Sequence, residues 1–160
     1  MKRRQAGFSL IELLIVVAII LILAAIAIPN LIQSKMTANE ASAVQTLRDI
    51  NTAESMYSIQ YGAGFSQDLP SLGGTTGTPT STNAELIPDP VAQSPNTKDG
   101  FSFTYVVTGN NGPNGTPSNY TVNANPITPG STGHRWFFTD ESFVIRYDTT
   151  GVATVNDPSI

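Results

Sequence analysis

The stretch QAGFSLIELLIVVAIILILAAIAIPN (residues 5–30) decides how this chain is organised. Residues 8–28 form a run of 21 residues, in which only Ser9 and Glu12 are not apolar. A helix needs roughly 20 apolar residues to cross a bilayer. The run therefore predicts a membrane-spanning helix. The carboxylate of Glu12 costs about 2.5 kcal/mol or more there, unless a partner or a position at the membrane edge offsets it.

Charge is unevenly distributed along the 160 residues, which carry a net charge of −4. Lys2, Arg3 and Arg4 supply three of the eight positive charges, and the chain after Gly7 carries 5 − 12 = −7. Basic residues beside a span stay in the cytoplasm, so the remaining chain is expected to face outward. The acidic body argues against nucleic acid as a partner, because phosphate binding needs clustered Lys or Arg. The absence of cysteine excludes disulfides and thiolate metal sites.

The pattern after the span predicts that the helix continues through residues 30–61. Pro29 removes one helical hydrogen bond, and beside a membrane we expect it to kink the helix rather than end it. Spacings of three, four and seven place one apolar stripe on this half: Met36, Ala43, Val44, Leu47, Ile50, Ala53 and Tyr57. The polar residues, Glu40 and Glu54 among them, are expected mostly on other faces. Glycine at position 62 is expected to cap the end.

Residues 62–160 predict a globular head. Residues 62–100 are rich in Gly, Pro, Ser and Thr and predict loops. Aromatic and β-branched runs then predict three or four antiparallel strands: FSFTYVVT (101–108), YTVNA (120–124), HRWFFTD (134–140) and FVIRYD (143–148). The fold class is therefore α+β, a long N-terminal helix packed on a small antiparallel sheet that buries the stripe. The expected sheet core includes Trp136, Phe137, Phe138, Phe143 and Tyr147.

The N-terminus has three interpretations. A secretory signal peptide would explain the basic start and the small-x-small pattern Ala25-Ile26-Ala27. The apolar run is longer than the usual 7 to 15 residues of such peptides, and a signal peptide has no use for Glu12. A plain membrane anchor explains the length and the charges, but it explains neither Glu12 nor the amphipathic continuation.

The third interpretation takes these residues as a set. KRRQAG before FSLIELLIVVAIILILAAIAIPNLIQSK resembles the N-terminus of type IV pilins and of the pseudopilins of type II secretion systems. The resemblance rests on the basic leader, on Gly7 followed by Phe8, on the acid four residues later, and on Pro29 after the apolar run. It is close over about the first 60 residues, and the remainder matches only in architecture.

The resemblance implies roles for individual residues. Prepilin peptidase would cleave between Gly7 and Phe8, which makes residues 1–7 a leader, and would N-methylate the new amine of Phe8. Glu12 would pair with the Phe8 amine of a neighbouring subunit and so fix the register of assembly, because sliding would leave both charges unpaired. The alternative is that Glu12 only marks the lipid interface. Pro29 would be the position where the helix kinks within the filament.

The resemblance also implies the chain's organisation and function. Residues 8–29 would be the transmembrane and assembly helix, 30–61 its amphipathic half, and 62–160 the head. The chain would be a pilin, a structural subunit of a type IV pilus-like helical homopolymer. The alternative is a major pseudopilin of a type II secretion system, and a less favoured one is a membrane-anchored or secreted binding module. The partners would be other subunits, prepilin peptidase, a membrane platform protein and an assembly ATPase. The precursor would lie in the inner membrane with its N-terminus in the cytoplasm, and the filament would be periplasmic or extracellular.

The head offers no catalytic constellation, so we expect no enzyme activity. His134 is the only histidine and is expected to be structural. Pseudopilins of the major class can bind calcium in a C-terminal loop. The late acids Asp140, Glu141, Asp148 and Asp157 follow no such spacing, so we expect no metal and no cofactor.

Overall fold

The computed structural model describes residues 8–62, 64–75, 77–109, 112 and 116–160. The chain forms two compact units, which are described separately. The N-terminal unit ends at Lys35, and the C-terminal unit comprises Met36–Ile160. Gly7, the residue predicted to precede the cleavage site, lies outside the described residues.

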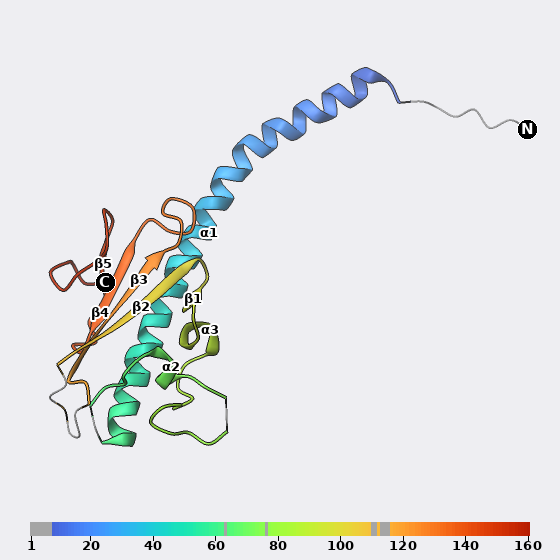
Figure 1. Ribbon diagram of the computed structural model, residues 1–160. Helices are drawn as coiled ribbons and strands as arrows, with labels where there is room; N and C mark the ends of the chain where they lie inside the picture. The colour runs from blue at the N-terminus through green and yellow to red at the C-terminus, as the bar shows by residue number, and fades with distance from the viewer. Residues whose placement is uncertain (1–7, 63, 76, 110–111, 113–115) are drawn as a thin grey trace, which may run out of the picture. The chain divides into compact units, whose positions relative to one another are not determined.

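The described residues form three helices and five strands (Figure 1). These elements are α1 (Leu10–Tyr61), α2 (Leu69–Leu72), α3 (Asp89–Ala92), β1 (Thr97–Lys98), β2 (Phe101–Thr108), β3 (Asn119–Pro126), β4 (Trp136–Asp140) and β5 (Arg146–Asp148). Adjacent strands of the sheet follow chain order, β1-β2-β3-β4-β5, and every pair is antiparallel. The α+β fold class predicted from the sequence is confirmed.

Helix α1 continues through Pro29, as the sequence predicts. Its end follows from the residue after it. Gly62 has a φ of 65° and donates its N–H to the carbonyl oxygen of Ser58 at 3.0 Å. A left-handed residue at this position satisfies one of the last carbonyls of the helix, and glycine adopts that conformation without a Cβ clash.

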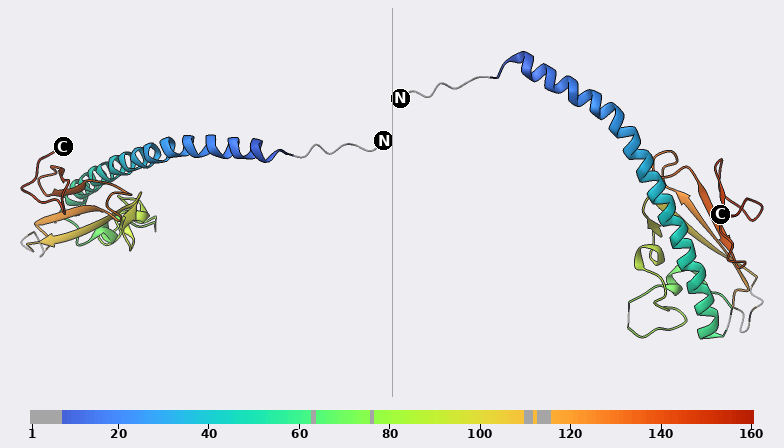
Figure 2. Two further views of the ribbon diagram at one scale, coloured as in Figure 1. Left: turned by 90° about the horizontal axis from the view of Figure 1, so that it is seen from above. Right: turned by 180° about the vertical axis from the view of Figure 1, so that it is seen from behind.

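The predicted apolar stripe is buried against the sheet. Within the C-terminal unit, Figures 1 and 2 agree that α1 lies along one face of the sheet. Leu47 and Ile50 have no exposed surface, and they belong to one core with Phe101, Tyr120 and Phe137 from β2, β3 and β4. Alternation along the strands produces this face, because residues two apart point to the same side of a sheet.

Several predictions need correction. The sheet has five strands rather than the three or four expected, and Trp136, expected in the core, is only partly buried and lies outside the core cluster. Residues 62–100 are not all loop, because α2, α3 and β1 form there, although each has four residues or fewer. Phe143 is not core but 44% exposed, since it follows β4 in a left-handed conformation with a φ of 60°. Glu40 and Glu54 were expected on the polar faces of α1, yet they are only 6% and 0% exposed.

Candidate functional site

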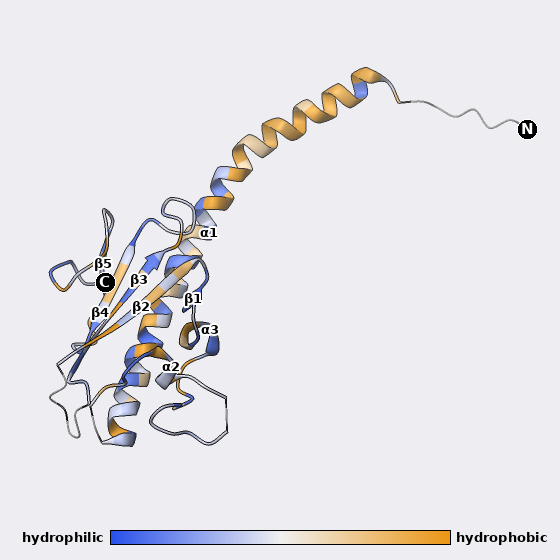
Figure 3. Ribbon diagram, in the orientation of Figure 1, coloured by the Kyte–Doolittle hydropathy of each residue, from blue (hydrophilic) through white to orange (hydrophobic). Residues whose placement is uncertain are grey.

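The described apolar residues of the N-terminal unit, from Phe8 onward, form no buried core of their own. Figure 3 shows that this part of α1 is almost continuously hydrophobic. Most of its large side chains are more than half exposed, for example Leu10 at 80% and Ile26 at 63%. Among the described residues, α1 is the helix that is long and apolar enough to cross a membrane by length and composition. An exposed apolar surface of this size marks a site of interaction with a membrane or with another protein.

The N-terminus of α1 places Glu12 in a capping arrangement. The backbone N–H of Ser9 donates to Oε2 of Glu12 at 3.0 Å, and the carbonyl oxygen of Ser9 accepts from Leu13 N–H at 3.3 Å. Ser9 and Glu12 thus form part of a capping box, whose signature is Ser followed three residues later by Glu. The sequence carried this signal, but the pairing hypothesis for Glu12 overlooked it.

The capping arrangement leaves room for the predicted role of Glu12. Phe8 is 85% exposed and lies directly before Ser9, whose N–H the carboxylate already accepts. One carboxylate can accept several hydrogen bonds, so it can cap its own helix and also meet a cation from outside. The roles of Phe8 in methylation, of Glu12 in register and of Pro29 as a kink all remain predictions.

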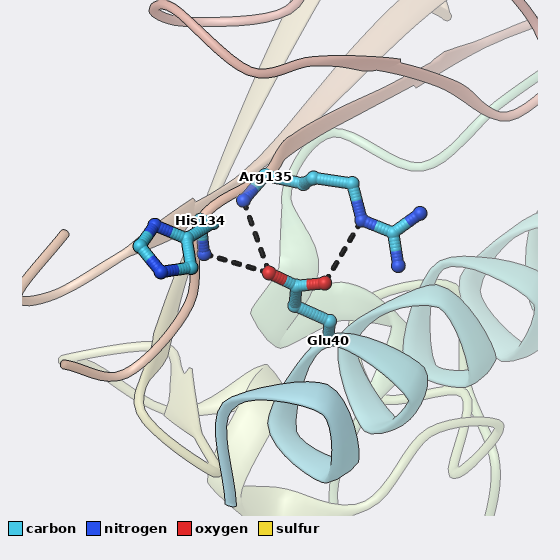
Figure 4. Close-up of polar contacts among 3 residues, drawn as sticks. All are labelled: Glu40, His134 and Arg135. Atoms are coloured by element: carbon cyan, nitrogen blue, oxygen red, sulfur yellow. Dashed lines mark hydrogen bonds and ion pairs between the residues drawn. The ribbon is translucent and has the colours of Figure 1, made fainter. Parts of the chain in front are cut away.

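Glu40 joins α1 to the segment before β4 (Figure 4). Its Oε1 accepts the backbone N–H groups of His134 at 2.6 Å and Arg135 at 3.1 Å, and its Oε2 accepts Nε of Arg135 at 2.8 Å. The Arg135 guanidinium also lies over the rings of Phe137 and Tyr147, at 5.5 Å and 5.7 Å from their centroids. His134 contributes its backbone N–H, so the contact does not depend on the imidazole.

Glu54 joins α1 to the loop after it and to β2. Its carboxylate accepts Ser66 N–H at 3.0 Å, Ser66 Oγ at 2.6 Å and the Tyr105 hydroxyl at 2.6 Å. The Tyr105 ring stacks on Tyr120 at 5.5 Å, and the Tyr120 hydroxyl donates to Asn51 Oδ1 at 2.9 Å. Burial raises the pKa of Glu54, while the hydrogen bonds from Ser66 and Tyr105 lower it, and the balance is a raised pKa. Burial and the nearby Glu54 carboxylate also raise the pKa of Tyr105, which keeps its hydroxyl protonated as a donor.

These polar contacts connect α1 to the loops and strands of the C-terminal unit. Within the described residues, no group of three or more His, Cys, Asp or Glu side chains is placed to hold a metal ion. His134 is exposed, and Asp148 accepts hydrogen bonds from Thr149 and Thr150 in a local turn. The feature that calls for a partner is therefore the apolar segment at the N-terminus.

Comparison with known proteins points to the same segment. Residues 2–28 match the prokaryotic N-terminal methylation motif. The chain is 49% identical over 57 residues to the type IV wide pilus major component PilA4 of Thermus thermophilus, a match that covers 36% of this chain and 44% of that protein. It is 40% identical over 58 residues to the type II secretion system core protein G of Aeromonas hydrophila, covering 36% of this chain and 41% of that protein.

A third relative is the type IV major pilin protein PilA of Myxococcus xanthus, which is 50% identical over 54 residues, covering 34% of this chain and 24% of that protein. The chain thus matches less than half of the length of each of these relatives. No solved structure matches the chain. The motif and the relatives together support the family of type IV pilins and type II secretion pseudopilins.

Proposed function

We propose that this chain, as a member of the family of type IV pilins and type II secretion pseudopilins, is a structural subunit of a filament. The observation that carries the proposal is the exposed apolar segment of α1 within the methylation motif. Lipid would surround this segment before assembly, and the same segments of neighbouring subunits would surround it afterwards. The role is structural rather than enzymatic.

The N-terminal residues would act in sequence. Cleavage between Gly7 and Phe8 would remove Lys2, Arg3 and Arg4, and the new amine of Phe8 would be methylated. Glu12 would then meet the Phe8 amine of a neighbouring subunit. Apolar contacts between helices vary little when one helix slides along another, whereas a buried ion pair is lost. The pair would therefore fix the register between subunits.

Two kinds of filament fit these observations equally well. The relatives include both pilus components and secretion core proteins. We favour a pilus-like filament, extended from the inner membrane by a platform protein and an assembly ATPase, and the alternative is a shorter secretion pseudopilus. Electron microscopy of cells labelled with an antibody to residues 36–160 separates the two, since a pilus extends well beyond the outer membrane.

The test of the proposal is the N-terminus of the mature protein. Material sheared from cells is analysed by intact-mass and tandem mass spectrometry. The expected chain begins at Phe8 and carries one additional methyl group on its amine. A chain that begins at Ile28 would identify a secreted protein, and one that retains Met1 would identify a plain anchor. Either result would overturn the proposal.

A further inference from the structure

The two edges of the sheet differ in how the chain itself protects them. The edge beside β5 is covered by the last residues of the chain. Tyr147 donates its N–H to the carbonyl oxygen of Pro158 at 3.0 Å, and Ile160 donates to that of Ile145, also at 3.0 Å. This edge therefore has its backbone groups paired within the molecule, as natural sheets usually arrange.

The edge beside β2 is covered over only part of its length. Strand β1 pairs with Phe101 and Ser102 alone, and the next contact is the N–H of Phe103, which donates to the carbonyl oxygen of Asn96 at 2.8 Å. Alternate residues of a strand direct their backbone groups to opposite edges, so those of Tyr105 and Val107 face the same edge as those of Phe103. Within the described part of the chain, neither has a backbone partner there.

The open part of this edge lacks the usual protection against pairing. The strand FSFTYVVT contains no charge, no proline and no glycine, whereas exposed edges normally carry such residues. A groove of about 360 Å³ runs beside it, lined by residues 102–105 on one wall and by residues 68–70 and 95–96 on the other. At Tyr105 the edge thus offers backbone groups that have no backbone partner among the described residues, in a groove with a second wall, while Val107 lies beyond the residues that line this groove.

We propose that the open edge of β2, at Tyr105 and Val107, accepts an extended segment of a second copy of this chain as an added strand. Unpaired backbone donors and acceptors along a strand edge are matched by another extended backbone, which supplies acceptors and donors at the same spacing. The proposal rests on the proposed function, because a homopolymer brings copies of the chain close together.

Charge favours a second copy at this edge. Cleaved copies, which lack Lys2, Arg3 and Arg4, carry a formal side-chain charge of 5 − 12 = −7 and repel one another. The uncharged strand β2 is a surface where they can approach without that repulsion. The donated segment is not β2 itself. Pairing of β2 with β2 would be symmetric and would stop at a dimer, whereas a filament grows through contacts between two different surfaces.

The test compares amide hydrogen exchange in two states of the full chain, filaments and detergent-solubilised subunits. Exchange at Tyr105 and Val107 is resolved by fragmentation and mass spectrometry. We expect both amides to exchange at least about 100-fold more slowly in filaments than in subunits, because an added strand protects them. Equal exchange in filaments and subunits would overturn this proposal while leaving the filament itself intact. Failure to form filaments would overturn both proposals.

A matched pair of proline variants tests the same edge independently. Val107→Pro removes an N–H that faces the open edge, a position where proline is tolerated. Val106→Pro is the control, because Val106 pairs with Thr121 and its N–H belongs to the ladder with β3. We expect Val107→Pro subunits to keep their folded near-UV circular dichroism but to give roughly tenfold less filament. Val106→Pro is expected to lower the melting temperature as well. A normal filament yield from folded Val107→Pro would overturn the proposal.

Discussion

At the residue scale, Glu40 shows how a buried acid can organise distant backbone. Replacing it by Ala leaves the N–H groups of His134 and Arg135 without their acceptor, each at a cost of about 1 to 3 kcal/mol. Arg135→Ala removes the ion pair and the stacking of a side chain that is 39% exposed, which costs less. We therefore expect Glu40→Ala to destabilise the fold more than Arg135→Ala does.

Thermal unfolding of both variants, followed by near-UV circular dichroism, checks this order. Glu40→Gln is the control, because its amide oxygen can still accept from the two backbone groups. Equal losses in Glu40→Ala and Arg135→Ala would mean that the side-chain ion pair, and not the backbone contact, carries the stabilisation.

The raised pKa of Glu54 predicts that the stability of the fold depends on pH, and the direction of the shift gives the sign of that dependence. In the folded chain the pKa lies above the ordinary value of 4.5, because burial disfavours the charged form. Its contribution to stability is therefore fully present below pH 4.5 and is lost as the pH rises through the folded pKa. Relative to Glu54→Gln, which does not titrate, the native chain should lose stability over that window, by about 1.4 kcal/mol for each unit of pKa shift. Urea unfolding of both chains between about pH 4 and pH 8 measures the difference. A constant difference would contradict the prediction.

Glu12 has two roles that substitutions can separate. Gln keeps an oxygen that can cap Ser9 N–H but removes the charge, whereas Ala removes both. If the charge pairs with the Phe8 amine of a neighbour, the peptidase should cleave both variants normally. The filament yield of both should fall by a factor of at least about ten. Mass spectrometry of the N-terminus and the yield of sheared filament give the two readouts. A normal yield from Glu12→Gln, with a loss only in Glu12→Ala, would assign the residue to capping alone.

At the element scale, the stabilising part of α1 is its buried stripe. Leu47 has no exposed surface, while Ile59 on the same helix is 82% exposed. Leu47→Ala should destabilise the C-terminal unit by about 2 to 5 kcal/mol, because it removes buried methyl groups and leaves a cavity. Ile59→Ala is the control and should change the free energy of unfolding by less than about 0.5 kcal/mol. Urea unfolding compares the two, and similar losses would argue against the observed packing of the helix on the sheet.

The same elements show what the sequence could predict. The alternation in FSFTYVVT predicted a strand with the bounds that β2 has, because its two faces differ sharply in burial. The stripe on α1 was predicted for the same reason, since periodicity records which face is buried. Glu40 and Glu54 were missed. Their burial depends on partners that folding brings from 94 and 51 residues away, His134 and Tyr105, and no local pattern records such contacts. Phe143 was predicted wrongly because its left-handed backbone in the turn after β4 overrides its hydrophobicity.

At the scale of the whole molecule, burial is divided between the two units. Every residue of the hydrophobic core cluster lies in the C-terminal unit, Met36–Ile160. The large apolar residues before Lys35 are exposed instead, for example Leu21 at 64% and Leu31 at 69%. The exposed apolar surface before Lys35 is therefore formed by other residues than those that pack against the sheet.

This division predicts that residues 36–160 fold without the apolar segment. The truncated chain keeps the core cluster, the contact of Glu40 with Arg135 and the contact of Glu54 with Ser66, which hold α1 to the sheet and to the loop after the helix. We expect it to dissolve without detergent, to show a cooperative thermal transition, and to elute as a monomer at low concentration. Size-exclusion chromatography and circular dichroism test this. An aggregated or unfolded product would mean that the residues before Met36 contribute to folding as well as to assembly. A folded monomer would show that they are not needed for folding, as expected if they act in the membrane and the filament.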